Sequence, residues 1–225
     1  MAPTVVAVIA TACAANYLAL SAWLPARLLG VVGLGAACII QGLPSHSPHA
    51  CFGAANRTTV ARGILVAFLV TLLFEQADQR VQFVALSVGA LAATLDAVDG
   101  WLARRTGMSS AFGARFDMET DALFIFVLSV WAWRLDKTGP WVIAAGLLRY
   151  AFVLATMLVP ALRGDLPPSF RRKSIAAVLM IALLVVIAPF VPASESAPVA
   201  ALALLALAMS FAIDIVWLLR RPVQS

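Results

Sequence analysis

Residues 96–121 read D-A-V-D-G-W-L-A-R-R-T-G-M-S-S-A-F-G-A-R-F-D-M-E-T-D, and the rest of the chain is best understood from this stretch. It lies where two hydrophobic segments meet, and it carries four aspartates, Asp96, Asp99, Asp117 and Asp121. A charged side chain at membrane depth is costly, so each is a functional candidate that needs a partner of opposite charge. The stretch therefore predicts a functional site in a chain that is otherwise apolar.

The spacing of the aspartates predicts two pairs, each on one face of a helix. Asp96 and Asp99 are three residues apart, and Asp117 and Asp121 are four apart, which places each pair on a shared face. If the two helices are antiparallel neighbours joined by a loop around residues 100–112, the pairs converge on one point. Carboxylate oxygens suit hard cations such as Mg²⁺ and Mn²⁺. Arg104, Arg105 and Arg115 could supply part of the compensating positive charge, and divalent cations would supply it better. The structural alternative is an ion-pair network with Arg104 and Arg115.

The composition indicates a membrane protein. Of the 225 residues, 63% are hydrophobic and 12% are charged, whereas soluble domains contain about 45–50% apolar residues. Basic cytoplasmic loops account for the net charge of +5. No basic stripe interleaved with aromatic residues indicates nucleic-acid binding. The three cysteines lie in apolar surroundings and do not suggest a disulfide framework.

Hydrophobic runs predict an all-α, polytopic membrane helical bundle, because backbone polar groups in lipid must bond within the segment. A spanning helix needs about 20 apolar residues, so the short second run is expected to tilt little, to lie at the interface or to form a hairpin with the first. The runs cover about residues 5–22, 27–43, 60–76, 81–99, 114–134, 140–161, 174–192 and 198–219.

Loop charges predict the orientation of these helices. Most basic loop residues fall on one side, and the positive-inside rule places that side, the aspartates and both termini in the cytoplasm. The basic residues on that side are Arg104, Arg105, Arg163, Arg171, Arg172, Lys173, Arg220 and Arg221, against Arg80, Arg134 and Lys137 on the other.

A polar segment, G-L-P-S-H-S-P-H-A-C-F-G, follows the second hydrophobic run. His46, His49 and Cys51 could be three zinc ligands, but a structural zinc site takes four. We therefore interpret this segment as a linker.

The aspartate stretch resembles the signature of the CDP-alcohol phosphotransferase family, D-x2-D-G-x2-A-R-x8-G-x3-D-x3-D. Every fixed position matches: Asp96, Asp99, Gly100, Ala103, Arg104, Gly113, Asp117 and Asp121. A weaker resemblance lies upstream, where Asn56, Thr59 and Arg62 match N-x-x-T-x-x-R. Incidental capping at a helix start is the alternative there. The resemblance implies a six-helix membrane core at residues 51–225, preceded by a hydrophobic extension of two helices at residues 1–50.

The resemblance also implies an activity. Family members move a substituted phosphate, commonly phosphatidyl, from a CDP-linked donor such as CDP-diacylglycerol to the hydroxyl of a small polar acceptor. CMP is released, and the reaction belongs to phospholipid biosynthesis. The resemblance implies two Mg²⁺ or Mn²⁺ ions per site, held by Asp96, Asp99 and Asp117, with Asp121 as the catalytic base and a further metal contact. It implies a homodimer, and nucleotide contacts from Asn56, Thr59, Asp96, Gly100, Ala103, Arg104 and Gly113.

Basic residues suggest where the acceptor binds. Arg149 lies inside a hydrophobic run, and Arg163, Arg171, Arg172 and Lys173 lie on the predicted cytoplasmic side. Guanidinium forks suit phosphate, so a phosphorylated acceptor is one interpretation. A positive-inside anchor and a neutral or zwitterionic acceptor such as serine stay open. Asp214, within the last hydrophobic run, is expected to pair with a basic residue.

A transporter of divalent cations or protons is the second functional hypothesis, since intramembrane aspartates are common in transport. Transport does not explain the fixed spacing of Gly100, Arg104 and Gly113, so we favour the transferase.

Overall fold

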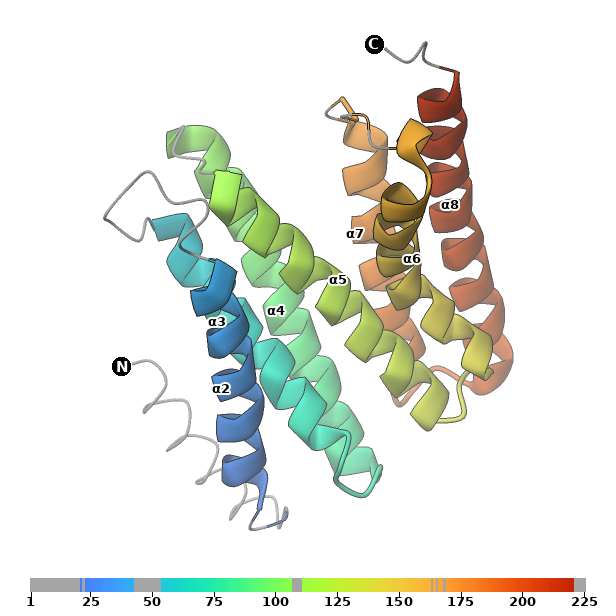
Figure 1. The fold of residues 1–225 in the computed structure, drawn as a ribbon. Helices are drawn as coiled ribbons and strands as arrows, with labels where there is room; N and C mark the ends of the chain where they lie inside the picture. The colour runs from blue at the N-terminus through green and yellow to red at the C-terminus, as the bar shows by residue number, and fades with distance from the viewer. Residues whose placement is uncertain are drawn as a thin grey trace. The chain divides into compact units, whose positions relative to one another are not determined.

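The computed structural model describes the chain in several stretches, and Figure 1 draws them as coloured ribbons. They are residues 21, 23–42, 54–106, 111–162, 164, 166–167 and 169–220; within them, the side chains of residues 34–42, 54–57, 98–106 and 111–115 are not described. The described residues form seven α-helices and two short 3-10 helices, without a strand. The predicted all-α fold is therefore confirmed. The first predicted helix, at residues 5–22, lies outside the described residues apart from residue 21.

The chain divides into two compact units, Met1–Leu123 and Phe124–Ser225. The division falls inside helix α5, Ala111–Arg134. The division predicted from sequence, with an extension at residues 1–50 and a core at residues 51–225, rests on the family resemblance and stays a prediction.

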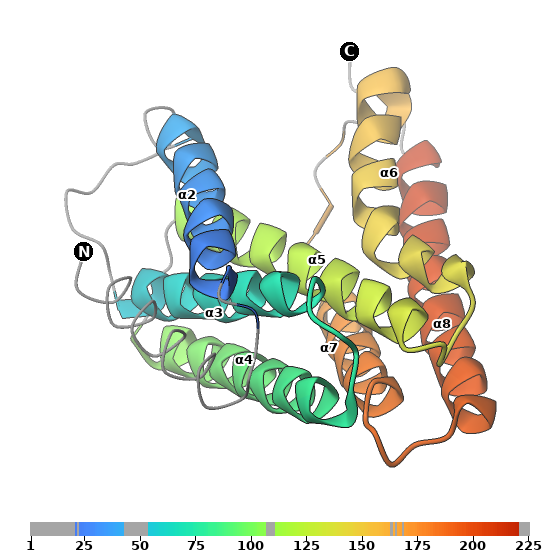
Figure 2. The ribbon, with the colours of Figure 1, turned by 90° about the horizontal axis from the view of Figure 1, so that it is seen from below.

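The first unit contains α2 (Leu24–Gly42), α3 (Ala54–Leu72), α4 (Gln79–Thr106) and the start of α5. Helix α3 packs against both α2 and α4, as Figure 2 shows. Residues three or four positions apart lie on one helix face, and the buried apolar residues follow this spacing. They include Leu24 and Leu28 in α2, Val66, Leu69 and Leu72 in α3, and Val81, Ala85 and Ala92 in α4.

An ion pair fastens α2 to the connection between α3 and α4. Nη1 of Arg27 lies 3.0 Å from Oε1 of Glu75, and the backbone N–H of Ser21 donates to Oε2 of the same carboxylate at 3.0 Å. The Arg27 guanidinium also lies over the ring of Phe74, 5.5 Å from its centroid. Because Glu75 is buried, these contacts supply the partners that its charge requires.

The second unit contains the rest of α5 and every helix that follows it. These are the 3-10 helix η2 (Pro140–Ile143), α6 (Ala144–Leu158), the 3-10 helix η3 (Pro160–Leu162), α7 (Phe170–Val186) and α8 (Ala193–Leu219). Helix α7 packs against α8, and α6 comes close to α5 at Gly146. A Cβ atom added to Gly146 would lie 2.6 Å from Cβ of Phe126. Only glycine permits that approach.

One contact joins two turns of this unit. The Lys137 ammonium donates to the backbone carbonyl of Val191. This links the connection after α5 with the connection between α7 and α8. Helix α8 begins at Ala193, earlier than the run at 198–219 predicts, because Pro192 accepts backbone hydrogen bonds from Glu195 and Ser196 and so starts the helix before Pro198.

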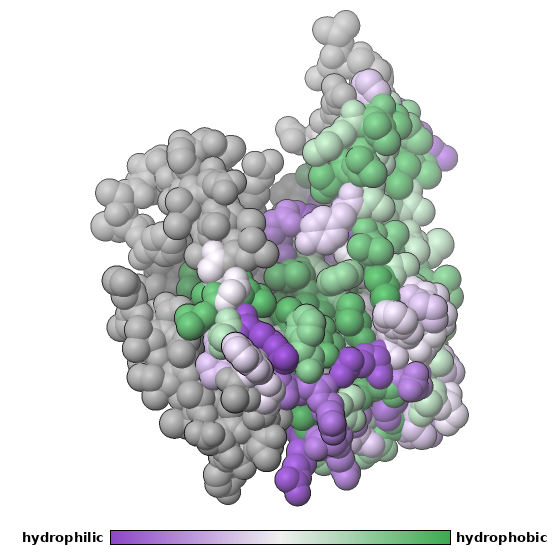
Figure 3. Space-filling model, turned by 60° about the horizontal axis from the view of Figure 1, so that its bottom comes forward, coloured by the Kyte–Doolittle hydropathy of each residue, from purple (hydrophilic) through white to green (hydrophobic). Residues whose placement is uncertain are grey.

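Some of the described helices have the length and composition of membrane spans. Among the described residues, three segments are long and apolar enough to cross a bilayer, Gln79–Ala97, Pro140–Leu158 and Ala193–Leu219. Helix α8 exposes Leu202, Leu205, Met209, Ile213 and Val216 at helical spacing. Figure 3 shows apolar side chains over much of the visible described surface. A soluble protein rarely exposes such a face, whereas lipid covers it.

Candidate active site

Among the described residues of the first unit, Arg62 is the largest buried charged side chain, with 0% of its surface exposed. It lies within the apolar helix segment Thr58–Leu72. A buried charge is stable only when it is paired and hydrogen-bonded. The partners of Arg62 therefore define what this part of the protein is built to hold.

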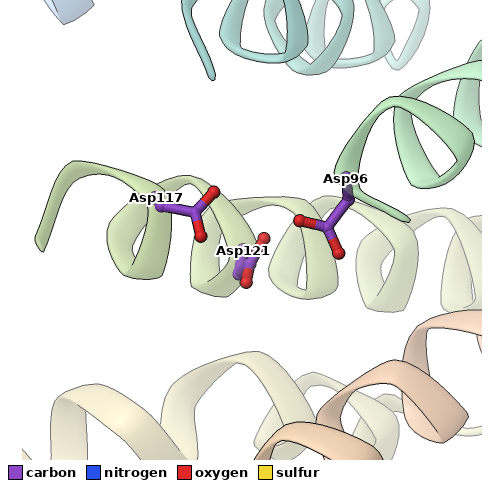
Figure 4. Close-up of side chains that lie close together, drawn as sticks. All are labelled: Asp96, Asp117 and Asp121. Carbon is purple, nitrogen blue, oxygen red and sulfur yellow. The ribbon is translucent and has the colours of Figure 1, made fainter. Parts of the chain in front are cut away.

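Three aspartates from two helices converge beside Arg62. Asp96 comes from α4, and Asp117 and Asp121 lie one turn apart on α5. Figure 4 shows Asp96 turned toward the other two. One carboxylate oxygen from each residue lies within 4.8 Å of the others. The predicted convergence is therefore confirmed for three of the four aspartates, and the side chain of Asp99 lies outside the described residues.

The guanidinium of Arg62 contacts all three carboxylates. Its Nη1 lies 2.7 Å from Oδ1 of Asp96 and 2.7 Å from Oδ1 of Asp117, while Nη2 donates a hydrogen bond to Asp121. The aspartates are 32%, 43% and 31% exposed as side chains, whereas Arg62 is closed off. The cluster thus has a buried positive side and an open negative side from which a ligand can approach.

The charges of the cluster suit a divalent cation. Three carboxylates against one guanidinium leave a formal charge of −2 on these four side chains. All three carboxylates offer oxygen, the ligand that Mg²⁺ and Mn²⁺ prefer. An ion with oxygens at ~2.1 Å holds them at most ~4.2 Å apart, so a spacing of 4.8 Å needs only a small contraction. The residues present therefore fit the predicted metal.

The predicted nucleotide contacts lie on the same helices. Asn56 and Thr59 are in α3, Gly100, Ala103 and Arg104 are in α4, and Gly113 is in α5. Thr59 is buried, one turn before Arg62. The side chains of the others lie outside the described residues.

The predicted loop at residues 100–112 is too long. Helix α4 continues to Thr106 and α5 begins at Ala111. Leu102, Ala103, Arg104 and Arg105 are strong helix formers, and together they carry the helix past Gly100. The two helices therefore take up most of the predicted loop.

Arg62 is the residue that we underrated from the sequence. It completes the N-x-x-T-x-x-R pattern, yet the arginines expected to balance the aspartates were Arg104, Arg105 and Arg115, whose side chains lie outside the described residues. The signal was present, because Arg62 is a charged residue within an apolar run. Its partners cannot be identified from the sequence alone, because they lie on two other helices, α4 and α5, that approach α3 only in the folded protein.

A second charged cluster lies in the second unit, around Asp214. Nη2 of Arg171 lies 2.5 Å from Oδ1 of Asp214, and Nη1 of Arg172 lies 3.3 Å from the same atom. Nη1 of Arg171 also donates to the Ser210 backbone carbonyl and hydroxyl at 2.9 and 3.0 Å. The predicted pairing of Asp214 with a basic residue is confirmed.

The remaining basic residues predicted to bind the acceptor are placed less fully. Arg149 is half-buried in α6, and Lys173 is exposed in the first turn of α7. Arg163 lies outside the described residues, as do His46, His49 and Cys51. Their predicted roles, and the linker interpretation, stay predictions.

Fold and site together define the class of this protein. Apolar helices with lipid-suited faces make it an integral membrane protein, and the carboxylates beside Arg62 form a group that can hold a metal ion. The chain belongs to the CDP-alcohol phosphatidyltransferase family, whose sequence model matches residues 52–215. It is therefore a transferase of substituted phosphate groups, acting in phosphatidyl transfer from a CDP-alcohol to an alcohol in lipid synthesis. Comparisons with curated proteins and with solved structures found no match.

Proposed function

We propose that this protein transfers a phosphatidyl group from a CDP-linked lipid, such as CDP-diacylglycerol, to the hydroxyl of a small polar acceptor. The new bond joins the acceptor oxygen to the β-phosphorus, and the bond between that phosphorus and the bridging oxygen breaks. CMP leaves with the bridging oxygen, and the acceptor hydroxyl gives up its proton. The convergence of Asp96, Asp117 and Asp121 on one open point is the observation that supports this proposal most directly.

The four aspartates have different roles in this proposal. Asp96, Asp99 and Asp117 hold divalent ions, Mg²⁺ or Mn²⁺, two per site, and Asp121 takes the proton of the acceptor hydroxyl and also contacts the second ion. When bound, such ions neutralise the diphosphate and make its phosphorus electrophilic. Asp121 is suited to its role because it shares a helix face with Asp117 and is held in place by a hydrogen bond from Arg62. The protein otherwise contributes position and electrostatics.

Helices α3, α4 and α5 supply the nucleotide contacts. In this proposal Asn56, Thr59, Ala103 and Arg104 meet the cytidine and its phosphates, together with Asp96. Gly100 and Gly113 let the backbone approach them closely. Of the other six residues, Gly100, Ala103, Arg104 and Gly113 lie on the two helices that carry the aspartates, α4 and α5. Asn56 and Thr59 lie on α3, the helix that carries Arg62, which supports a common binding region.

The acceptor is a small polar alcohol, and a phosphorylated alcohol suits the basic residues best. Arg171 and Arg172 bring two positive charges against one negative charge at Asp214, and both guanidiniums stay partly exposed. Each guanidinium has five N–H donors, and Asp214 and its neighbours use only part of them. Arg149, Arg163 and Lys173 complete the proposed acceptor contacts.

The proposed setting is the cytoplasmic face of the membrane, with the protein as a homodimer. The excess of basic residues in the loops on the aspartate side supports this orientation. The bilayer is then both solvent for the helices and the source of the lipid donor.

The test is an assay of CMP release by purified full-length protein in detergent micelles or proteoliposomes. CDP-diacylglycerol is the donor, and glycerol phosphate, inositol phosphate, inositol and serine are separate acceptors. We expect CMP and a new phospholipid with one acceptor, and none in EDTA. The absence of CMP release with every acceptor and with either metal would contradict the proposal.

A further inference from the structure

Arg62 has no part in the transfer chemistry proposed above, yet it is the group around which the carboxylates gather. It is fully buried and contacts Asp96, Asp117 and Asp121 at once. Its Nε atom is buried without a hydrogen-bond partner, so the guanidinium is placed by its two terminal nitrogens alone. The position of Arg62 is therefore explained by the attraction between its terminal nitrogens and the carboxylates, because its hydrogen-bonding capacity is not fully used.

We propose that Arg62 is a positioning residue that serves as the built-in counter-cation of the aspartate cluster. It holds the three carboxylates together before divalent ions bind, and it shares their charge with the ions afterwards. This inference rests on the proposed function, because it takes the cluster to be the metal site.

The geometry shows that Arg62 and an ion would draw on the same carboxylates. Nη1 lies at the same distance, 2.7 Å, from oxygens of Asp96 and Asp117. An ion bound by both carboxylates would also have to lie between them. One oxygen from each of the three carboxylates lies within 4.8 Å of the others; a nitrogen at hydrogen-bond distance can bridge that spacing, and a metal at ~2.1 Å needs only a small contraction of it. Arg62, from the buried side, and an ion, from the open side, would therefore compete for the negative charge of these two carboxylates.

Electrostatics explain why such a residue is needed. The three carboxylates come from two helices, and without a cation their mutual repulsion would drive α4 and α5 apart at this point. Arg62, carried by a third helix, offsets that repulsion at all times because a guanidinium stays protonated. Its placement on the buried side leaves the open side of the aspartates for the ions.

As a consequence, the charge of Arg62 and bound metal ions can partly replace each other in stabilising the fold. Wild-type protein keeps its cluster neutralised in part without metal, so added ions stabilise it modestly. A variant without the positive charge depends on ions for the same task, so added ions stabilise it more. A role confined to packing would lower stability equally with and without metal.

The experiment measures thermal unfolding of full-length protein in detergent, in EDTA and in Mn²⁺, for wild type, Arg62→Gln and Arg62→Lys. We expect the rise in Tm produced by Mn²⁺ to be largest in Arg62→Gln, smallest in wild type and intermediate in Arg62→Lys. Arg27→Gln is the matched control. It also breaks a pair with a buried carboxylate in the first unit, Glu75, and should lower Tm by the same amount in both conditions.

Direct Mn²⁺ binding, measured by electron paramagnetic resonance, gives a second readout. Arg62→Lys keeps the positive charge but loses the forked guanidinium that contacts three carboxylates. If Arg62→Gln does not fold, Arg62→Lys is the variant whose Mn²⁺ binding is compared with wild type. We expect the Kd for Mn²⁺ to fall by about tenfold in Arg62→Gln, and by less in Arg62→Lys, because a competing positive charge is removed or displaced.

Two outcomes would overturn the inference: an Mn²⁺-induced rise in Tm that is the same in wild type and the Arg62 variants, or weaker Mn²⁺ binding in the variants. Parallel CMP assays separate the two proposals. A larger Mn²⁺-induced rise in Tm in the Arg62 variants, with no CMP release by wild type, would refute the proposed function alone. CMP release with an unchanged rise in Tm would refute the role of Arg62 alone.

Discussion

Nη1 of Arg62 lies 2.7 Å from Oδ1 of Asp117, although 55 positions separate the two residues in the chain. The contact joins α3 to α5, and Asp96 brings α4 to the same nitrogen. A buried guanidinium facing three carboxylates therefore connects the helix upstream of the family signature to both helices that carry it.

Asp121→Asn should abolish transfer while leaving Mn²⁺ binding largely intact. The amide keeps the size of the side chain but cannot take the proton of the acceptor hydroxyl. CMP release and Mn²⁺ binding are measured on the same purified variant. Glu119→Gln is the control, since Glu119 is an exposed residue on the same helix. Turnover of Asp121→Asn at the wild-type rate would contradict the role of Asp121 as base.

CMP release should stop in excess EDTA and return on addition of Mg²⁺ or Mn²⁺. Asp96→Asn should raise the Mn²⁺ concentration for half-maximal rate by about tenfold or more, because affinity follows the number of charged oxygen ligands. Metal titrations of wild type and variant provide the measurement. Full activity in EDTA, or an unchanged titration in Asp96→Asn, would argue against Asp96 as a ligand.

Arg172→Gln should raise KM for a phosphorylated acceptor by about tenfold with little change in kcat, as expected when uniform binding is lost. This variant is preferred to Arg171→Gln because Asp214 keeps its shorter contact, with Arg171, and so is not left unpaired. Arg220→Gln, at the exposed end of α8, is the control. Equal small effects of both substitutions would favour a membrane anchor over an acceptor contact.

Gly146→Ala should lower the stability of the protein by about 1–3 kcal/mol, the usual cost of overpacking. The new methyl group would meet the backbone and side chain of Phe126, so α6 and α5 would have to separate. Gly33→Ala in α2 is the control, because no atom lies within 4 Å of its added Cβ. Thermal unfolding compares the two, and equal Tm values would show that the close approach carries no cost.

Removal of residues 1–50 should leave CMP release in place but lower Tm. The aspartates and the family match at residues 52–215 lie beyond the deletion, whereas Leu24, Leu28 and the Arg27 pair with Glu75 are lost with α2. Activity per folded molecule, from size-exclusion peaks, is the measurement. A folded but inactive truncation would show that the extension belongs to the catalytic unit.

Much of the fold follows from the sequence, because helices in lipid satisfy their backbone within each segment. The apolar runs predict each described helix to within several residues. The ends are less exact, since α4 extends through Arg104 and α8 begins before Pro198. In both places local hydrogen bonding and helix propensity set the end of the helix, whereas the predicted runs follow hydropathy alone.

The pairing of charges is harder to predict, and helices α3 and α5 show why. Both are apolar with little preference for one face, because a membrane helix meets lipid outside and other apolar helices inside. The inward side therefore cannot be read from hydropathy as it can for a soluble helix. Only the packed helices reveal that Arg62 points at the aspartates and that Arg171 and Arg172 meet Asp214.

The sequence by itself determined the helical membrane fold, the aspartate signature and, through it, the family. These depend on residue type and local spacing, which the chain carries in order. The tertiary structure decided which positive charge neutralises the aspartates, because that depends on which faces of three helices meet. Among the described side chains, Arg62 is shown in that position, because its helix, α3, packs beside α4.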